Sequence, residues 1–419
     1  MRPFRTRRRL ALAVAATVAT LVFAVTAHAG VTVLYAFKGG SDGSNPNASL
    51  IIDAAGNLYG TTLTSGSGVG TVFKLAPDGS ETVLHAFNGR KGDGALPYGG
   101  LIANKEGNLY GTTEYGGTHR GGTVFKLSPD GAETVLYSFC SKANCIDGAN
   151  PSGGLFLDKK GNLYGTTGYG GGTGCEDGFG CGTVFKLAPD GTETVLHTFT
   201  GGTDGSLPQE TLIQDEEGNF YSTTKQGGGG DCQSGYFGRG CGTVFKIAPD
   251  GTETVLYAFR GHKDGSYPSG LIRDKTGNFY GATGTGGGNH CRPSRGCGTV
   301  FKLTPDGTET LLYAFAGAKD GAFPYDLIRD KAGNLYGATY QGGGGNCQPQ
   351  HGCGTVFGIA PDGTEKVLFA FKSHKREGKE PYGGLLKGKG GELYGVASSG
   401  GSLDDCNGFG CGTVFGLQR

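Results

Sequence analysis

The chain has 419 residues, 86 of them glycine, with no tryptophan and one methionine, Met1. Its 37 basic and 37 acidic residues balance. Residues 1–29 hold five arginines and no acid, so 32 basic and 37 acidic residues follow them, a net charge of −5. No basic patch is visible, which argues against nucleic-acid binding.

The first 29 residues have the composition of an export signal. Arg7, Arg8 and Arg9 precede an apolar stretch over residues 10–25, and Ala27-His28-Ala29 offers a small-residue cleavage site. We expect cleavage after Ala29 and an exported mature protein, periplasmic or extracellular. No later apolar run approaches the roughly 18 residues that span a bilayer, so we expect no membrane span.

From residue 31 onward the chain repeats. A strand-like segment at residues 31–37 comes first, and the tetrapeptide Gly-Thr-Val-Phe then recurs at intervals of 52 to 60 residues. A period of this length indicates a repeat architecture rather than one irregular core. The seven copies begin at Gly70, Gly122, Gly182, Gly242, Gly298, Gly354 and Gly412.

Each copy divides into four short strands, A to D, which read LI-x-D, N-L/F-Y-G-x-T, GTVFKL and ETVLYAF. Asp-x-x-Gly-Asn links A to B and Pro-Asp-Gly links C to D, and glycine supplies the positive φ that tight hairpins need. Four antiparallel strands repeated seven times predict an all-β fold, a single seven-bladed β-propeller over residues 30–419.

The phase of the repeat predicts how the ring closes. The mature chain opens on a D strand at residues 31–37 and ends on a C strand at residues 413–417, with no D strand after it. We therefore expect residues 31–37 to complete the last blade as its outer strand. The strand directions then put the variable B–C and D–A loops together on one face, called the upper face here, where a rigid scaffold usually carries binding loops.

All twelve cysteines fall in pairs within these upper loops. The spacing predicts a disulfide at the base of each longer loop, which an oxidising location allows. Zinc is the alternative, but no C-x-x-C pair occurs and tetrahedral ligand spacing is missing. Cys140 and Cys145 could instead cross to Cys175 and Cys181. The expected local pairs are Cys140/Cys145, Cys175/Cys181, Cys232/Cys241, Cys291/Cys297, Cys347/Cys353 and Cys406/Cys411.

An acidic residue stands in every D–A loop, followed by Gly, two residues and Pro. By symmetry we expect a ring of these acids on the upper face, near the entry of the A strands into the central channel. One interpretation is a Ca²⁺ site or polar ligand mouth. The other, which we favour, is a turn in which Asp bonds its own backbone. The acids are Asp42, Asp93, Asp147, Asp204, Asp264, Asp320 and Glu377.

Aromatic residues form two groups. One Tyr recurs in every B strand, where packing between blades is the expected role. A second group lies in the upper loops, where we expect ligand contacts from Tyr115, Tyr169, Tyr236, Tyr267, Phe323 and Tyr340, with Phe179, Phe237 and Phe409 as further exposed candidates.

No Ser/His/Asp or Cys/His set stands out, and no carboxylate pair is unique to one blade, so we name no catalytic residue. His85 and His197 replace the Tyr of strand D in their copies and are interpreted as outer-strand packing or surface residues. We expect no cofactor, apart from Ca²⁺ at the acidic ring.

The repeat resembles the GloVer tandem-repeat family of exported bacterial proteins. The similarity covers residues 31–419 and rests on GGLI-x-D-x-x-GNLYGTT, then GTVFKL, then PDG-T-E-T-VLYAF. It implies a propeller and export, but no catalytic residues. Family members often carry a C-terminal surface anchor, and we expect this chain to differ from them in having none. The pattern is also similar to NHL and lactonase-type propellers, at the level of fold alone.

These observations favour a monomeric, non-catalytic exported propeller that binds a glycan, another extracellular polymer or a protein through its upper loops. Blades of nearly equal sequence favour several weak binding sites over one strong site. An enzyme of lactonase or lyase type with an axial cation is the first alternative. A purely structural envelope protein is the second.

Overall fold

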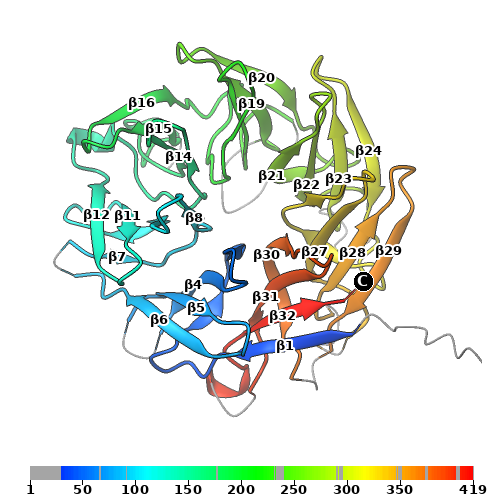
Figure 1. Ribbon diagram of the computed structural model, residues 1–419. Helices are drawn as coiled ribbons and strands as arrows, with labels where there is room; N and C mark the ends of the chain where they lie inside the picture. The colour runs from blue at the N-terminus through cyan, green and yellow to red at the C-terminus, as the bar shows by residue number, and fades with distance from the viewer. Residues whose placement is uncertain are drawn as a thin grey trace, which may run out of the picture.

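The computed structural model describes residues 30–418, except 66–67, 91, 176–177, 231, 233–239, 289–290, 292–295, 346, 348–351, 373–375 and 403–405. The expected export signal lies outside this part. Seven antiparallel sheets, each with strands A to D, stand around a central axis as blades 1 to 7 (Figure 1). The predicted seven-bladed propeller is confirmed.

The innermost strand of each blade, strand A, is continuous in blades 5 and 7 and short or broken in the others. In blades 1 and 6 it is split into two pieces that both pair with strand B. In blade 2 the upper piece, β7 (Gly94–Ala95), pairs with β10 (Tyr115–Gly116). The A strands are β2 (Ser44–Pro46), β3 (Ile51–Ile52), β8 (Ile102–Ala103), β13 (Phe156–Leu157), β17 (Ile213–Gln214), β21 (Ser266–Arg273), β25 (Ala322–Pro324), β26 (Ile328–Arg329) and β30 (Lys379–Lys387).

The two middle strands, B and C, form the regular part of each blade. The B strands are β4 (Leu58–Thr64), β9 (Leu109–Thr113), β14 (Leu163–Thr167), β18 (Phe220–Thr224), β22 (Phe279–Thr285), β27 (Leu335–Gln341) and β31 (Leu393–Ser399). The C strands are β5 (Thr71–Leu75), β11 (Thr123–Leu127), β15 (Thr183–Leu187), β19 (Thr243–Ile247), β23 (Thr299–Leu303), β28 (Thr355–Ile359) and β32 (Thr413–Leu417).

Strand D forms the outer edge of each blade. The D strands of blades 1 to 6 are β6 (Glu81–Ala86), β12 (Glu133–Ser138), β16 (Glu193–Thr198), β20 (Glu253–Ala258), β24 (Glu309–Ala314) and β29 (Glu365–Ala370). Two short 3₁₀ turns, η1 (Ala143–Cys145) and η2 (Cys406–Gly408), lie in upper loops.

The N-terminal strand closes the ring as predicted. β1 (Val31–Ala36) is the D strand of blade 7 and pairs antiparallel with β32, with Val31 opposite Leu417 and Ala36 opposite Thr413. Figure 1 shows β1 alongside β32, at opposite ends of the colour scale. The first and last blades are thus joined by chain pairing, which removes an open sheet edge.

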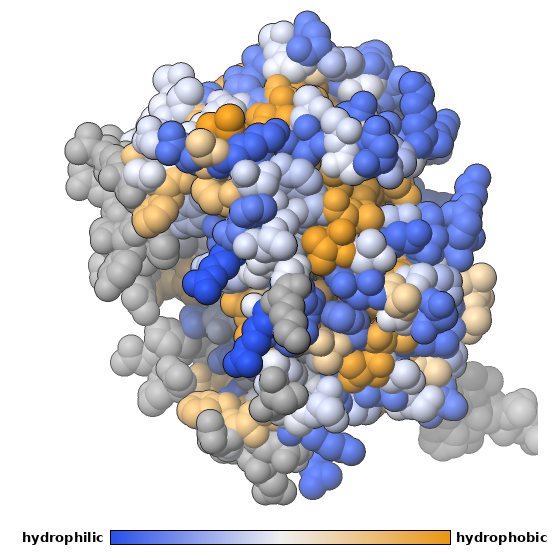
Figure 2. All heavy atoms as spheres, turned by 90° about the vertical axis from the view of Figure 1, so that its left-hand side faces the viewer, coloured by the Kyte–Doolittle hydropathy of each residue, from blue (hydrophilic) through white to orange (hydrophobic). Residues whose placement is uncertain are grey.

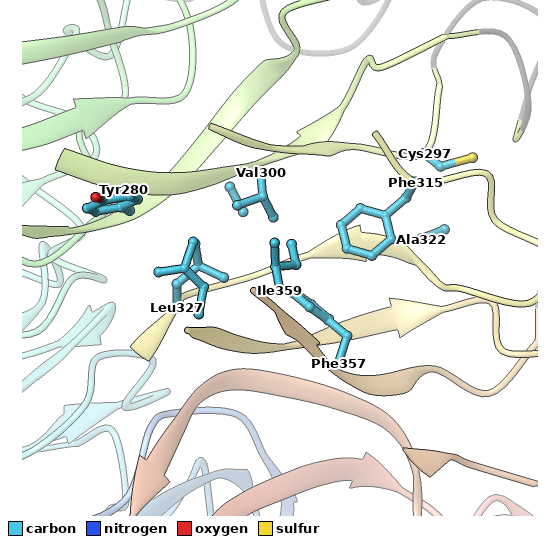
Figure 3. Close-up of a cluster of buried hydrophobic side chains, with 10 residues drawn as sticks. Tyr280, Cys297, Val300, Phe315, Ala322, Leu327, Phe357 and Ile359 are labelled. Carbon is cyan, nitrogen blue, oxygen red and sulfur yellow. The ribbon is translucent and has the colours of Figure 1, made fainter. Parts of the chain in front are cut away.

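A buried Phe–Phe contact joins each blade to the next. The Phe of Gly-Thr-Val-Phe packs edge-to-face on the Phe that follows strand D of the preceding blade, as in Phe37 with Phe73, whose ring centroids lie 5.2 Å apart. A Cβ on Gly60, opposite Phe73 in strand B, would lie 2.7 Å from that ring, so glycine makes room for it. Figure 3 shows this layer between blades 5 and 6, where Phe315 faces Phe357.

The six predicted disulfides are present, each local to its loop. Cys140 bonds Cys145 within one D–A loop, which resolves the alternative pairing. The other five close B–C loops over sequence separations of 5 to 9 residues. They are Cys175–Cys181, Cys232–Cys241, Cys291–Cys297, Cys347–Cys353 and Cys406–Cys411.

The second cysteine of each B–C pair lies at the base of its loop, as predicted, and is also buried. This cysteine directly precedes Gly-Thr-Val-Phe, so the start of strand C carries it into the core between blades. Cys297, Cys353 and Cys411 are each 0% exposed, and they pack in the same clusters as the Phe that follows strand D, as Cys297 does with Phe315. Cys181 and Cys241 are buried in the same way. These five residues are therefore structural and present no surface to a ligand.

The bridges also connect the two kinds of upper loop. They lie against D–A loop glycines such as Gly201, where a Cβ would approach Cys175 Sγ to 2.6 Å, and Gly317, where a Cβ would approach Cys291 Sγ to 2.5 Å. Glycine at these positions lets the disulfide pack directly on the backbone. The bridges therefore fix the upper B–C loops onto the upper D–A loops.

The outer wall mixes hydrophilic and hydrophobic residues. In the face seen in Figure 2, hydrophobic residues occur as separate groups among hydrophilic ones. Within the described ranges, no helix is long and apolar enough to cross a membrane.

Candidate functional site

The segments that lead from the upper face into the A strands have the same backbone in every blade. The residue before each entry proline has a left-handed backbone, with φ between 55° and 59° at all seven positions. Its N–H donates to a carbonyl just before strand C of the preceding blade, as from Tyr267 to Cys241 at 3.1 Å. The seven residues are Asn45, Leu96, Asn150, Leu207, Tyr267, Phe323 and Glu380.

Threonines of strand B hold several of these entry segments from the neighbouring blade. Thr166 Oγ1 donates to the carbonyl of Glu210 at 3.2 Å, and Thr223 Oγ1 donates to the carbonyl of Ser269 at 3.1 Å. The entry backbone is therefore shared scaffold, and the chemistry at the axis depends on which side chains it carries.

The entry segments and the ends of the B strands line an axial cavity of about 960 Å³. Its lining comes from all seven blades, although most of each blade is nearly the same in sequence. Directly after the second Thr of strand B, blades 3 and 5 have Gly, whereas Glu114, Lys225 and Tyr340 occupy this position in blades 2, 4 and 6. The lining thus combines residues of the shared GGLI motif with side chains that are specific to single blades.

Blades 4 and 6 bring charged groups into this cavity. Lys225 Nζ donates to Glu210 Oε1, both in blade 4, and Asp326 of blade 6 accepts from the N–H of Gly270 at 2.9 Å. Burial raises the pKa of Glu210 to about 7, against the opposing effect of Lys225, and burial also raises the pKa of Asp326. For Lys225, burial acts to lower the pKa, but the charge and hydrogen bond of Glu210 outweigh it and the pKa is raised.

Three tyrosines form one wall of the cavity. The ring of Tyr325 lies 4.2 Å from that of Tyr382 and 6.4 Å from that of Tyr340, between centroids. Burial raises the pKa of Tyr325 well above its usual value, and the neighbouring phenol of Tyr382 adds to the effect. The Tyr325 hydroxyl is therefore neutral at physiological pH, and the wall offers ring faces beside a neutral hydrogen-bonding group.

Five of the six loop aromatics predicted to contact ligand line this cavity: Tyr115, Tyr169, Tyr267, Phe323 and Tyr340. Tyr236, the sixth, and Phe237 lie outside the described residues. Phe179 and Phe409 are not among the lining residues and are 70% and 63% exposed.

The expected position of the acidic ring at the mouth of the central channel is wrong. Asp42 Oδ2 accepts from the hydroxyl of Tyr35 in outer strand β1 at 3.0 Å and from the N–H of Lys38 at 2.9 Å. These acids are held at the outer strands because their loops turn there, and none of them lines the cavity. Tyrosines of the outer strands make the same contact to Asp147, Asp264 and Asp320, and outer-strand histidines lie beside Asp93 and Asp204 at 3.4 Å and 3.8 Å.

Several cavity residues were not predicted from the sequence, notably Tyr98, Gln209, Glu210, Lys225, Tyr325, Asp326 and Tyr382. Glu210 and Lys225 form an acid–base pair within blade 4, which the expectation about carboxylate pairs did not include. The sequence did contain a signal for these cavity residues, because two places in the repeat vary from blade to blade while the residues around them do not. One is the segment between the entry Pro and the Leu of strand A, and the other is the residue after the second Thr of strand B.

Solved structures with similar architecture show the fold alone. Virginiamycin B lyase from Staphylococcus aureus is 11% identical, with a TM-score of 0.55 over 93% of this chain and 99% of the lyase. PorZ, a surface component of the type-IX secretion system of Porphyromonas gingivalis, is 14% identical, with a TM-score of 0.53 over 92% of this chain and 48% of PorZ. This chain spans about half of PorZ.

A comparison with curated proteins finds no match. The repeat itself is recognised over residues 15–237 and 231–419, which together include every residue that the structure describes. The chain belongs to the Gloeobacter/Verrucomicrobia repeat family.

Proposed function

We propose that this protein is an exported binding protein that takes a short carbohydrate chain in its axial cavity. The observation that carries the proposal is the concentration of blade-specific side chains around that cavity. Six disulfides are typical of an exported protein. A ring of near-equal blades needs no such differences for stability, so a site that uses them is the best-supported explanation.

The chemistry of the lining suits a sugar. Aromatic side chains from several blades supply ring faces, and Gln209, Gln226 and Glu210 supply amide and carboxyl groups beside them. Tyrosine combines a flat apolar body with a polar tip, so it can pack on the C–H face of a sugar and bond its hydroxyls. A cavity of about 960 Å³ is at the upper end of the usual range for ligand pockets.

The repeat provides variants for the test that other blades already carry. Tyr340→Ser gives blade 6 the serine that blade 7 has at this position, Ser398. Lys225→Gly gives blade 4 the glycine that blade 3 has there, Gly168. Binding of the mature, oxidised protein to a panel of soluble oligosaccharides is measured by calorimetry. Loss of one stacked ring removes about 0.5–1.5 kcal/mol, so Tyr340→Ser should weaken binding up to about tenfold.

Tyr257→Phe, which copies Phe369 of another outer strand, is the control and should bind as the wild type does. A sugar whose affinity is equal in wild type, Tyr340→Ser and Lys225→Gly would place binding elsewhere. An absence of binding across the panel would remove carbohydrate as the ligand class.

A second function, catalysis, is favoured by one observation. A carboxyl group with a pKa of about 7 in a cavity, as burial produces at Glu210, is suited to general acid or base chemistry near neutral pH. An enzyme would turn over a lactone or glycoside with a rate that changes near this pKa, and Glu210→Gln would abolish turnover while leaving binding in place. Binding without turnover in the wild type would reject this function.

A further inference from the structure

Away from the axis, neighbouring blades meet at outer seams, and at six of the seven seams an Asp of the D–A loop and a Glu of an outer strand face each other. The Asp comes from the loop after strand D of one blade, and the Glu is the first residue of strand D in the next blade. Asp42 and Glu81 form such a pair. Burial raises the pKa of that Glu, and the Asp charge adds to the rise. One Glu oxygen is buried and has no hydrogen-bond partner within the described residues in Glu81, Glu133, Glu193, Glu253, Glu309 and Glu365.

Most seams satisfy the Asp with a phenol. The hydroxyls of Tyr35, Tyr137, Tyr257 and Tyr313 donate to the facing Asp at 2.9–3.0 Å. At the seam of blades 1 and 2 the residue is His85, whose Nε2 lies 3.4 Å from Asp93 Oδ1. This distance is longer than a normal N–H···O bond of about 2.7–3.2 Å, so the imidazole does not reproduce the tyrosine contact.

From this arrangement we infer that His85, Asp93 and Glu133 bind a divalent transition-metal ion of the zinc type. One ligand atom from each side chain lies within 4.8 Å of the other two, a spacing that no other such group reaches in the described part of the chain. Two ligands held at about 2.0–2.1 Å by a tetrahedral zinc lie roughly 3.3–3.4 Å apart. The His85–Asp93 distance of 3.4 Å matches this edge.

The other contacts of the site leave room for an ion. Asp93 Oδ2 accepts the N–H of Asn88 at 2.8 Å and Oδ1 accepts the N–H of Gly94 at 2.7 Å, which fixes the carboxylate beside the imidazole. Glu133 Oε1 is buried without a partner among the described residues. An imidazole nitrogen and carboxylate oxygens are ligands that zinc takes in proteins.

The neighbouring seam shows that a cation fits at this place in the fold. Lys142 Nζ lies 2.8 Å from Glu193 Oε2, so an ammonium group occupies the seam of blades 2 and 3. In the seam of blades 1 and 2, the loop position that holds Lys38 and Arg260 in two other blades is Asn88. His85 is the described side chain that brings a nitrogen ligand to this pair of carboxyl groups.

The test uses His85→Tyr, which restores the residue found at four other seams, and His197→Tyr as the matched control. His197 stands at the equivalent position of blade 3, but its Nε2 lies 3.8 Å from Asp204. The mature, oxidised protein is stripped with EDTA and titrated with zinc chloride at a mildly alkaline pH by calorimetry. Cobalt chloride is then added in place of zinc and its visible absorption is recorded.

Wild type and His197→Tyr should bind one more equivalent of zinc than His85→Tyr, and should show cobalt d–d bands that His85→Tyr lacks. Glu133→Gln should weaken zinc binding by more than the roughly tenfold that loss of an outer-shell partner costs. Thermal unfolding in EDTA should be similar for wild type and His85→Tyr, which separates metal binding from folding. Equal zinc stoichiometry in wild type and His85→Tyr, or no uptake by the wild type, would overturn the proposal.

Discussion

We predict that the substitution Phe37→Ala destabilises the whole propeller, because Phe37 directly follows the strand that closes the ring. Phe37 follows β1 and is 0% exposed. Its ring lies 5.1 Å from that of Tyr35 and 5.2 Å from that of Phe73 in blade 1. The residue therefore links the N-terminal strand to the blade beyond it.

Truncation of a buried Phe to Ala costs about 3–5 kcal/mol in a packed core. Phe37→Ala should lower the free energy of unfolding by this amount, although the residue lies only a few positions from the expected mature N-terminus. Phe259→Ala is the matched control, since Phe259 is also 0% exposed and has the same two ring contacts at 5.1 Å and 5.2 Å inside the chain.

The assay is guanidinium unfolding of the mature, oxidised protein, followed by circular dichroism and by tyrosine fluorescence. If β1 were frayed at the terminus, Phe37→Ala would change the free energy of unfolding only a little. The reasoning fails if Phe37→Ala costs less than about 1 kcal/mol while Phe259→Ala costs about 3 kcal/mol or more, because the ring would then be closed by something other than β1.

Three further outcomes follow from the structure. Burial, with the facing Asp second, raises the pKa of Glu81, Glu253 and Glu365 to about 7. Their contribution to stability is complete below the unfolded pKa of about 4.3 and is lost as pH rises through about 7, so calorimetry should show a higher Tm at about pH 5 than at about pH 8. Changing all three to Gln should narrow that difference, and a wild-type Tm that rises over the same interval would contradict the assignment. Burial acts to raise the pKa of Asp274, but hydrogen bonds from Thr276, Asn278 and Tyr280 outweigh it and hold this pKa well below its usual value. The stability that Asp274 contributes should therefore be lost only as pH falls below about 3.9, and Asp274→Asn should flatten the acid limb of an unfolding curve. Replacing Cys175 and Cys181 by Ser removes a bridge that closes a sequence separation of 6 residues. The loss should cost about 2 kcal/mol in denaturant unfolding, and an unchanged midpoint would show that this loop is ordered without the bridge.

Much of the architecture was predictable because the repeat presents the same local pattern seven times. Alternating apolar residues in GTVFKL, glycine at the hairpins and proline at the loop entries each act over a few residues, and seven copies make the pattern unambiguous. The phase of the repeat identified residues 31–37 as the missing outer strand. Cysteines only 5 to 9 residues apart predicted the local disulfides, although not the burial of Cys297, Cys353 and Cys411 in the core.

The candidate site was harder to predict because position around a ring is a property of three dimensions. Asp42 lies in the loop after the outer strand β1, and Asp326 lies between the two pieces of strand A in blade 6, β25 and β26. Both acids belong to segments that lead from an outer strand to the axis, yet Asp42 is at the outer strand and Asp326 lines the axial cavity. The sequence does not say at which end of such a segment a given side chain lies.

By itself the sequence determined the strands, their order, the number of blades and the strand that closes the ring, because hairpin turns and alternating burial are local in the chain. Only the tertiary structure decided which side chains meet. Glu210, Tyr325 and Tyr382 come from three blades and share one cavity because the ring brings their entry segments to a common axis. His85 and Glu133 face each other because the outer strands of neighbouring blades meet at a seam.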